Sequence, residues 1–191
     1  MIGEPGAPAR SKVHARLNRR AEEFIARSPL VLVATASAAG QPTVSPRGGA
    51  PGFVRVPDRG TLVIPERKGN RLVFSLQNIL ANPRVGLIFL VPGTDESLRV
   101  GGEAEIRDDP ELCDSFAERG SGALLVTRVR VSECYFHCAK ALLRAGLWNP
   151  DTWPERMGIS FGQEIAEEGG LEADAIAEFD AGVRRRYETD L

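Results

Sequence analysis

Three runs of sequence decide the fold of this chain: SPRGGAPGFVRV (residues 45–56), TLVIPERKGNRL (61–72) and LQNILANPRVGLIFLVPG (76–93). They set short apolar segments beside turns rich in Gly and Pro, a pattern typical of strands joined by tight connections. Four cations lie in or beside these turns: Arg47, Arg67, Lys68 and Arg71. Loop cations held by a rigid β scaffold are a common means of gripping a phosphate. The runs therefore predict a β scaffold whose loops bind a phosphorylated ligand.

The strand pattern continues outside these runs. LVLVATA (30–36), SLRVGGEAEI (97–106) and ALLVTRVRVSECYF (123–136) predict further strands, mostly antiparallel because their connections are short. Helices are predicted over 11–27, 71–81, 110–119, 137–147 and, in one or two pieces, 162–187. Short connections exclude a Rossmann sheet, which needs right-handed βαβ crossovers. We expect a mainly β protein, a small closed β-barrel of six or seven strands with peripheral helices.

Length and charge suggest one domain with an appendage. Residues 1–10, rich in Gly, Pro and Ala, are predicted to be a disordered tail; 11–153 form the barrel domain and 154–191 an acidic helical extension. Residues 1–150 carry 20 Lys and Arg against 15 Asp and Glu, whereas 151–191 carry 4 against 11. Because the basic residues are scattered over loops rather than aligned on a helix, we do not expect nucleic-acid binding.

Neither a membrane span nor a metal site is expected. The longest apolar run, VGLIFLV (85–91), has the length of a strand, and no apolar segment follows the basic N-terminal residues as in a secretion signal. The three cysteines lack CxxC spacing, which is typical of reduced thiols in a cytoplasmic protein. Cys134 and Cys138 flank His137, but the other histidine, His14, is distant in sequence, so we expect a buried pair of thiols rather than a zinc site.

Two turns are candidates for the ligand site. In RGGAPG (47–52), Gly48 and Gly49 allow close approach of the backbone to a planar ligand while Arg47 reaches its phosphate; the alternative is a flexible hairpin end. ERKGNR (66–71) sets cations just ahead of a predicted helix, whose free N–H groups attract anions; the alternative is a solvated turn.

Other polar residues fit the same interpretation less directly. Ser75 and Asn78 fall on the polar side of the predicted helix and either continue the site or face water. Arg99 stands between apolar neighbours on a strand, where an inward direction would require an anionic partner. The run HCAKALLRAGLWNPDTW (137–153) puts His137, Lys140 and Arg144 on one helical face. Such a helix either closes a barrel end or contributes to a cofactor site and a subunit interface.

Hydrolase motifs are missing from the sequence. No Ser–His–Asp set, HExxH motif or isolated pair of carboxylates is present, and RGGAPG is neither GxGxxG nor a P-loop. If the protein is an enzyme, we expect a cofactor to carry the chemistry.

The chain resembles the pyridoxamine 5′-phosphate oxidase-like flavoproteins, in particular a subgroup of FMN-dependent enzymes of unassigned substrate. The resemblance rests on FIARSPLVLVAT, SPRGGAPGFVRV, TLVIPERKGNR, LQNILANPRVGLIFLVPG, LRVGGEAEI and CYFHCAKALLRAGLWNP, which together span about 20–153. It implies a six-stranded antiparallel split β-barrel that forms a homodimer, with FMN bound at the interface by both subunits.

The resemblance also implies which positions bind the cofactor. Ser45, Arg47 and Gly48 match the strand that faces the FMN ring and phosphate, and Ile64 and Pro65 lead into the phosphate-gripping turn. That turn and the helix behind it match at Arg67, Lys68, Asn70, Arg71, Ser75 and Asn78. Arg99 matches a position near the partner's flavin, and His137, Lys140 and Arg144 match the segment that reaches across the dimer.

These matches lead us to expect an FMN-dependent oxidoreductase that transfers a hydride to or from a small organic molecule. The oxidase proper ends in an Arg-containing substrate motif, which the acidic tail 154–191 replaces here, so oxidation of vitamin B6 ranks lower. The alternative is a non-catalytic flavin- or haem-binding protein on the same barrel, with His137 as the axial haem ligand. No side chain is assigned as a general acid or base.

Overall fold

The computed structural model describes residues 4, 6, 11–118, 120–170 and 172–190. Apart from Glu4 and Gly6, the predicted disordered tail 1–10 therefore lies outside the described residues. The chain divides into two compact units, residues 1–151 and 152–191. No helix in the described ranges is both long and apolar enough to cross a membrane.

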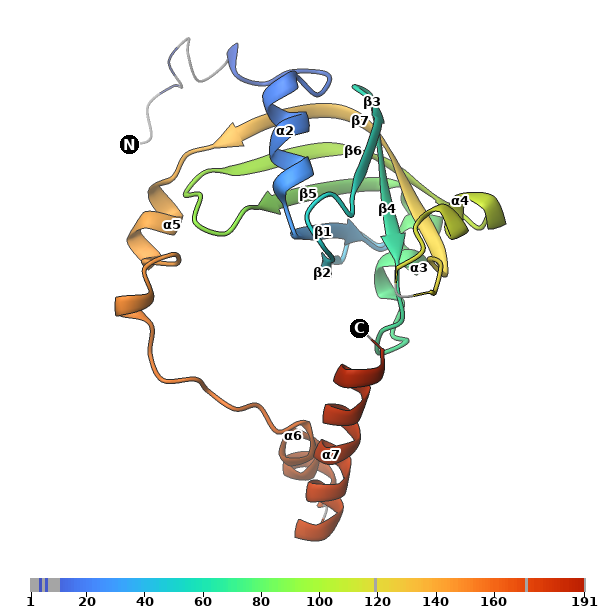
Figure 1. Cartoon of the computed structure of the whole chain (residues 1–191), viewed down its shortest axis with the longest axis vertical. Helices are drawn as coiled ribbons and strands as arrows, with labels where there is room; N and C mark the ends of the chain where they lie inside the picture. The colour runs from blue at the N-terminus through green and yellow to red at the C-terminus, as the bar shows by residue number, and fades with distance from the viewer. Residues whose placement is uncertain (1–3, 5, 7–10, 119, 171, 191) are drawn as a thin grey trace. The chain divides into compact units, whose positions relative to one another are not determined.

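The first unit is built on one antiparallel sheet (Figure 1), in the order β2-β1-β5-β6-β7-β4-β3. Its strands are β1 (Leu30–Ala36), β2 (Pro42–Gly48), β3 (Arg55–Asp58), β4 (Thr61–Glu66), β5 (Arg84–Leu90), β6 (Ser97–Arg107) and β7 (Leu125–His137). The mainly β, antiparallel class is confirmed. The sheet has seven strands rather than six, because the short β3 pairs with β4 as a separate strand.

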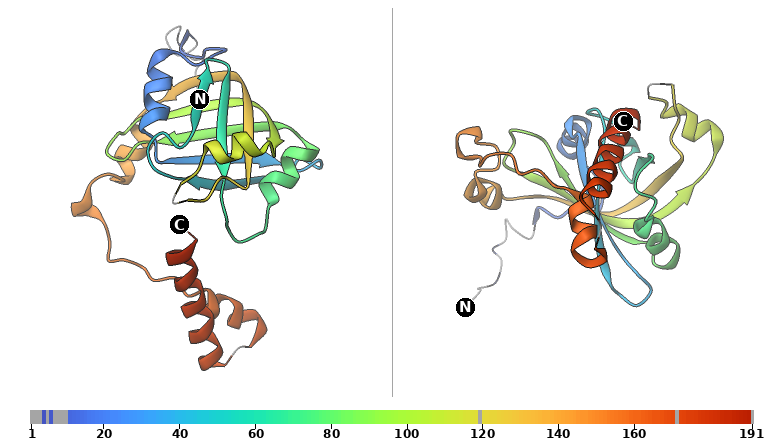
Figure 2. Two further views of the ribbon diagram at one scale, coloured as in Figure 1. Left: turned by 45° about the vertical axis from the view of Figure 1, so that its right-hand side comes forward. Right: turned by 90° about the horizontal axis from the view of Figure 1, so that it is seen from below.

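The sheet curves strongly but remains open (Figure 2), so the expectation of a closed barrel is wrong and that of a split barrel is confirmed. The strands at its two ends, β2 and β3, each pair on one side only within the described residues. A β-bulge at Gly101 and Gly102 shifts the register between the two longest strands, β6 and β7, and such bulges bend a sheet.

Helix α2 (Arg19–Arg27) starts later than the predicted 11–27. Asn18 caps it by accepting a hydrogen bond from the N–H of Ala21. The residues before it run along β7, where His14 and Cys134 exchange two backbone hydrogen bonds. Cys134 is buried there but Cys138 is exposed, so the expected buried thiol pair is wrong.

Three further helices lie on the barrel unit: α3 (Phe74–Ala81), α4 (Pro110–Ser115) and α5 (Lys140–Ala145). Figures 1 and 2 show α2 and α3 toward opposite ends of the curved sheet, and Ile25 of α2 and Ile79 of α3 belong to one core cluster. Helix α3 begins three residues after the predicted start, because Arg71 and Val73 have left-handed backbone angles that no α-helix contains.

The two faces of the sheet differ in burial. Alternate residues of the strands, including Val31, Leu87, Phe89, Leu98 and Val129, are 0–2% exposed and form the core with α2. Their neighbours on the other face, among them Leu32 and Ile88, are half-buried. This period of two is the pattern expected of strands with one face on a core.

The second unit holds α6 (Phe161–Gly169) and α7 (Ala173–Thr189), preceded by a 3-10 turn at Pro150–Thr152 that spans the division between the units. The presence of these two helices agrees with the prediction of one or two helices over residues 162–187. Gly162 lets the helices approach, since a Cβ there would lie 2.8 Å from the carbonyl oxygen of Ile176. Asp180 accepts a hydrogen bond from the Gly162 N–H.

The β6–β7 bulge provides a stability test. A Cβ on Gly102 would lie 2.3 Å from the Arg130 carbonyl oxygen, whereas one on Gly86 would meet the Ala34 Cβ at an ordinary 3.8 Å. We expect Gly102→Ala to lower the free energy of unfolding by about 1–3 kcal/mol, since backbone cannot yield as a side chain can. Gly86→Ala, its matched control, changes it by no more than about 0.5 kcal/mol. Urea denaturation measures both, and equal effects would contradict this account of the bulge.

Candidate functional site

The first part of the site lies where β2 approaches the end of β4. Ser45 and Arg47 pair with core residues of β1, so their side chains point to the inner face of the sheet. The Arg47 Nε donates to Glu66 Oε2 at 2.7 Å, and both side chains are largely buried. Because β2 ends the sheet on one side and β4 is next to the last strand on the other, this ion pair spans the split.

Glu66 is held by a second bond and was not predicted as a site residue. Its Oε1 accepts from the Thr127 hydroxyl at 2.8 Å. Arg47 gives one further hydrogen bond to the Pro46 carbonyl, so two of the five N–H donors of its guanidinium are in use. The remaining donors and a side-chain exposure of 19% leave Arg47 able to bind a ligand.

The segment 67–73 after β4 ends at an uncapped helix. Arg71 (φ 62°) and Val73 (φ 45°) take left-handed angles, which are costly for a β-branched residue such as Val73. Asn70 Oδ1 accepts from the Leu72 N–H at 3.1 Å, and no side chain caps α3. Lys68 and Arg71 are exposed on the segment that leads into this helix. The segment thus combines cations with a helix N-terminus, as anion sites do.

Arg67 has a different set of contacts from its two neighbouring cations. Its Nη2 donates to the Phe116 carbonyl at 2.6 Å and its Nη1 to the Ser121 carbonyl at 3.1 Å, with Glu118 at 3.3 Å. These bonds anchor the loop after α4 to the end of β4. We therefore expect Arg67 to hold this loop in place rather than to bind a phosphate.

Ser75 and Asn78 face the sheet rather than water. The Ser75 hydroxyl donates to the Ser45 hydroxyl at 3.0 Å. The Asn78 amide donates to the hydroxyls of Thr35 and Thr43, each at 3.0 Å. This network ties α3 to β1 and β2, so it fixes where the helix N-terminus points.

The remaining predicted residues of this part contribute backbone or shape. Ile64 is fully buried in the core, and Pro65 is buried beside it. Gly48 has room for a side chain, but at Gly49 a Cβ would lie 2.8 Å from the Cβ of Phe53. The 47–52 turn therefore requires glycine at Gly49, for space, and at Gly52, whose φ is 88°.

Arg99 and His137 form a second group on the other face of the sheet. Arg99 pairs with Ile88 on one side and Tyr135 on the other, and His137 follows Tyr135 by two residues, so all four share a face. Burial and the charges of Arg99 and Lys12 hold the pKa of His137 below its ordinary value.

Lys140 and Arg144 lie exposed on α5, just after β7. The segment that follows is tied back by the Trp148 indole, which donates to the Thr94 carbonyl at 2.8 Å. Within the described residues, no hydrogen bond or ion pair joins Arg99, His137, Lys140 or Arg144 to the Arg47 group. One ligand cannot contact Arg47 and Arg99 of the same chain directly, because they stand on opposite faces of the sheet.

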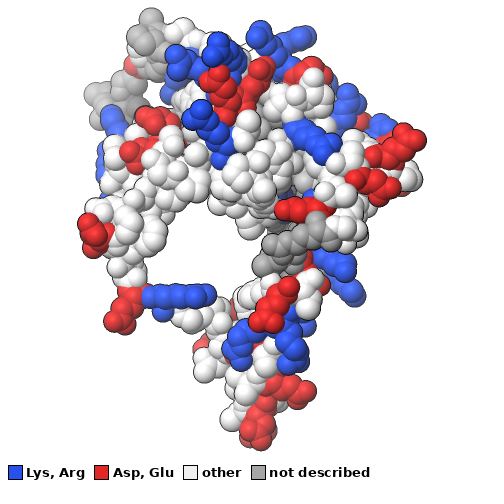
Figure 3. Space-filling view, viewed as in Figure 1, with Lys and Arg blue, Asp and Glu red and all other residues white. Residues whose placement is uncertain are grey.

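The surface charge of the barrel unit is mixed on the face that Figure 3 presents. Basic and acidic side chains alternate over it instead of gathering into one basic patch. Basic and acidic side chains of the unit also pair across β6 and β7, such as Arg128 with Glu105 and Arg130 with Glu103. This face therefore lacks the electrostatic footprint of a nucleic-acid interface.

The contribution of the Arg47–Glu66 ion pair to the free energy of unfolding can be compared with that of an exposed ion pair. We expect Glu66→Gln to lower the free energy of unfolding by about 1–3 kcal/mol, because it removes a charged partner of the largely buried Arg47. Glu103→Gln, which weakens an exposed pair with Arg130, is expected to cost less than about 1 kcal/mol. Equal midpoints for the two variants in urea would show that the Arg47–Glu66 pair does not hold the split.

Comparison with known proteins supports the architecture. HupZ of Group A Streptococcus superposes with a TM-score of 0.52 at 22% identity, covering 63% of this chain and 93% of HupZ. A candidate pyridoxamine 5′-phosphate oxidase of Lactobacillus delbrueckii gives 0.50 at 23% identity, covering 64% and 95%. An FMN-binding protein of Syntrophomonas wolfei gives 0.45 at 10% identity, covering 61% and 87%. A comparison with curated proteins found no match. The model of the pyridoxamine 5′-phosphate oxidase family matches residues 17–138, more than half of the sequence, and the chain belongs to that family.

Proposed function

We propose that this protein binds FMN and uses it as an oxidoreductase. The observation that carries the proposal is the junction of β4 and α3, where Lys68 and Arg71 stand beside an uncapped helix N-terminus and Arg47 faces the same end of the sheet. The split-barrel fold and the family match support a flavin as the phosphorylated ligand.

The residues present fit an FMN phosphate. Its charge would be met by Lys68 and Arg71, by free donors of Arg47 and by the first N–H groups of α3. Charge-assisted hydrogen bonds contribute about 1.5–3 kcal/mol each, enough to offset the ordering of two exposed side chains. Left-handed angles at Arg71 and Val73 are costly without a ligand, and strain of this kind is found at binding sites.

The opposite faces of Arg47 and Arg99 favour a site shared by two copies of the chain. In the proposed homodimer, one subunit supplies the phosphate end and the other supplies Arg99, His137, Lys140 and Arg144. The half-buried face that carries Arg99 is apolar along neighbouring strands, at Leu30, Leu32, Ile88 and Leu90. Apolar faces of this kind are covered in stable dimers.

Bound FMN would accept or donate a hydride. The chain's own groups bind and orient: Arg47, Lys68 and Arg71 hold the phosphate, and a donor such as Lys140 stabilises negative charge at the edge of the ring. A small organic molecule is the proposed substrate, with a nicotinamide or deazaflavin as donor. The free cysteines support a reducing compartment such as the cytoplasm.

The colour of the protein tests the proposal. We expect the purified protein to be yellow and to release one FMN per chain on denaturation, and the bound flavin to be reduced by NADH, NADPH or a reduced deazaflavin and reoxidised by an acceptor. A protein that is purified colourless and does not bind added FMN would contradict the proposal. A Soret band in its absorption spectrum would identify a haem protein instead. Bound FMN that no donor reduces would indicate a flavin carrier.

Variants of the phosphate end locate the site. We expect the double variant K68A/R71A to weaken FMN binding by about 100-fold or more, since it removes two charge-assisted contacts to the phosphate and no hydrogen bond or ion pair among the described residues. R47A is tested in an E66Q background, so that no buried carboxylate is left unpaired. Arg84→Ala, an exposed arginine at the start of β5, serves as the control. Fluorescence titration measures the dissociation constants. Unchanged affinity in K68A/R71A would place the phosphate elsewhere.

A further inference from the structure

Arg99 carries an unexplained buried donor. Among the described residues, its Nε is the one buried side-chain nitrogen or oxygen that has no hydrogen-bond partner. Buried polar atoms are nearly always paired, and an exception deserves a physical reason. An accepting oxygen of a ligand would supply the missing partner once the guanidinium turns toward it, because the Nε is closed to solvent in this structure.

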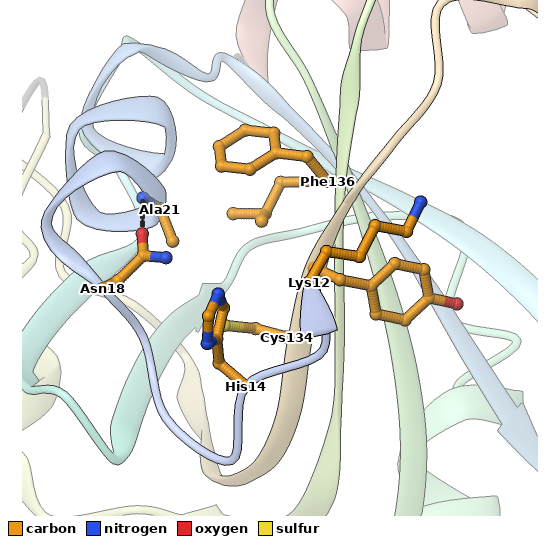
Figure 4. A pocket seen from close by; sticks show the side chains of 8 residues that line it. Lys12, His14, Asn18, Ala21, Cys134 and Phe136 are labelled. Carbon is orange, nitrogen blue, oxygen red and sulfur yellow. Dashed lines mark hydrogen bonds between the residues drawn. The ribbon is translucent and has the colours of Figure 1, made fainter. Parts of the chain in front are cut away.

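Two further basic side chains lie close to Arg99. Directly opposed residues of an antiparallel pair have Cβ atoms about 5 Å apart and diagonal ones about 7–8 Å apart, which places Tyr135 beside Arg99 and His137 diagonal to it. Lys12, on the segment before α2, has its Nζ 5.6 Å from the centroid of the Tyr135 ring, and Figure 4 shows the Lys12 side chain pointing away from Asn18 and α2. Three elements far apart in sequence thus bring Lys12, Arg99 and His137 together.

Among the described residues, no acidic side chain forms an ion pair with Arg99, Lys12 or His137. Glu133, opposite Gly101 on β7, is the nearest acidic residue in the register and is diagonal to Arg99; its side chain lies over Gly101, with its Cγ 2.8 Å from where a Cβ would be. Asp95 and Glu96, in the turn before β6, form no ion pair with Arg99 either. The charges that depress the pKa of His137 are cationic, those of Arg99 and Lys12.

The surroundings indicate the kind of anion. Ile88, beside Arg99, continues into an apolar row with Leu32 on β1, and Leu30 and Leu90 form the next row on the same face. In the dimer proposed above these rows belong to the subunit interface, so a ligand at Arg99 would lie at their edge, where an apolar body with one carboxylate fits better than a free phosphate.

We propose that Lys12, Arg99 and His137, with Tyr135 between them, form a subsite for the carboxylate of a small organic substrate. Calling the ligand a substrate rests on the proposed flavin function; the anion subsite itself does not. Binding of the anion offsets the two neighbouring cations and therefore raises the pKa of His137. By linkage, affinity increases as the pH falls through that pKa, about tenfold for each unit by which binding shifts it.

NMR titration of the two histidines tests this with benzoate as the probe. Only His14 and His137 give imidazole signals, and His14→Gln assigns them. In the FMN-free protein we expect His137 to titrate below its ordinary pKa, benzoate to raise that pKa, and benzamide, the neutral analogue, to leave it unchanged. Arg99→Gln should raise the pKa of His137 in the absence of ligand and weaken the binding of benzoate at least tenfold. Lys12→Gln should change both quantities in the same direction. Arg128→Gln, an exposed arginine on β7, is the control for both.

Three outcomes would overturn the subsite. They are a His137 pKa at or above the ordinary value, a benzoate response retained in Arg99→Gln, and inorganic phosphate binding to the cluster as tightly as benzoate. Repeating the titration with FMN-loaded protein separates substrate from cofactor: displacement of benzoate by FMN would mean that the flavin occupies the cluster and would contradict the substrate assignment. A protein that binds benzoate as described but no FMN would refute the proposed function and leave the anion subsite standing.

Discussion

The ion pair between Arg47 and Glu66 is the interaction on which the candidate site depends. It joins a strand at one end of the sheet to a strand near the other, so it spans the split that hydrogen bonds between strands leave open. Thr127 holds Glu66 from a third strand, which fixes the carboxylate before a ligand arrives. The same pair presents Arg47 at the end of β4, close to where the 67–73 segment begins. The ion pair that links the two ends of the sheet therefore also positions a phosphate-binding cation.

Helix α3 depends on a second constraint of the same kind. Besides the buried Ile79, hydroxyl and amide side chains attach it to β1 and β2, because Ser75 and Asn78 face Ser45, Thr35 and Thr43. Hydrogen bonds are directional, so this attachment fixes the rotation of the helix as well as its position. The free N–H groups of its first turn thereby acquire a defined direction, which an anion site needs.

Much of this fold could be predicted from local sequence, and the departures have physical reasons. The strand over residues 30–36 was predicted with its observed bounds, because apolar periodicity and turn residues are local signals. The start of α3 was placed too early because left-handed angles at Arg71 and Val73 have no signature in those side chains. Glu66 was overlooked because its partners, Arg47 and Thr127, are 19 and 61 residues away. Lys12 was overlooked because the segment before α2 was expected to be helical instead of running along β7.

Whether this site is a flavin phosphate site is the central question, and a comparison of FMN with riboflavin answers it most directly. The two ligands share the ring system and differ in the phosphate that Arg47, Lys68, Arg71 and α3 are proposed to hold. Equilibrium titration of the FMN-free wild-type protein, followed by flavin fluorescence, gives both dissociation constants. We expect FMN to bind one per chain and riboflavin to bind at least about 100-fold more weakly, the equivalent of two charge-assisted hydrogen bonds. Equal affinities, or no binding of FMN, would contradict the account.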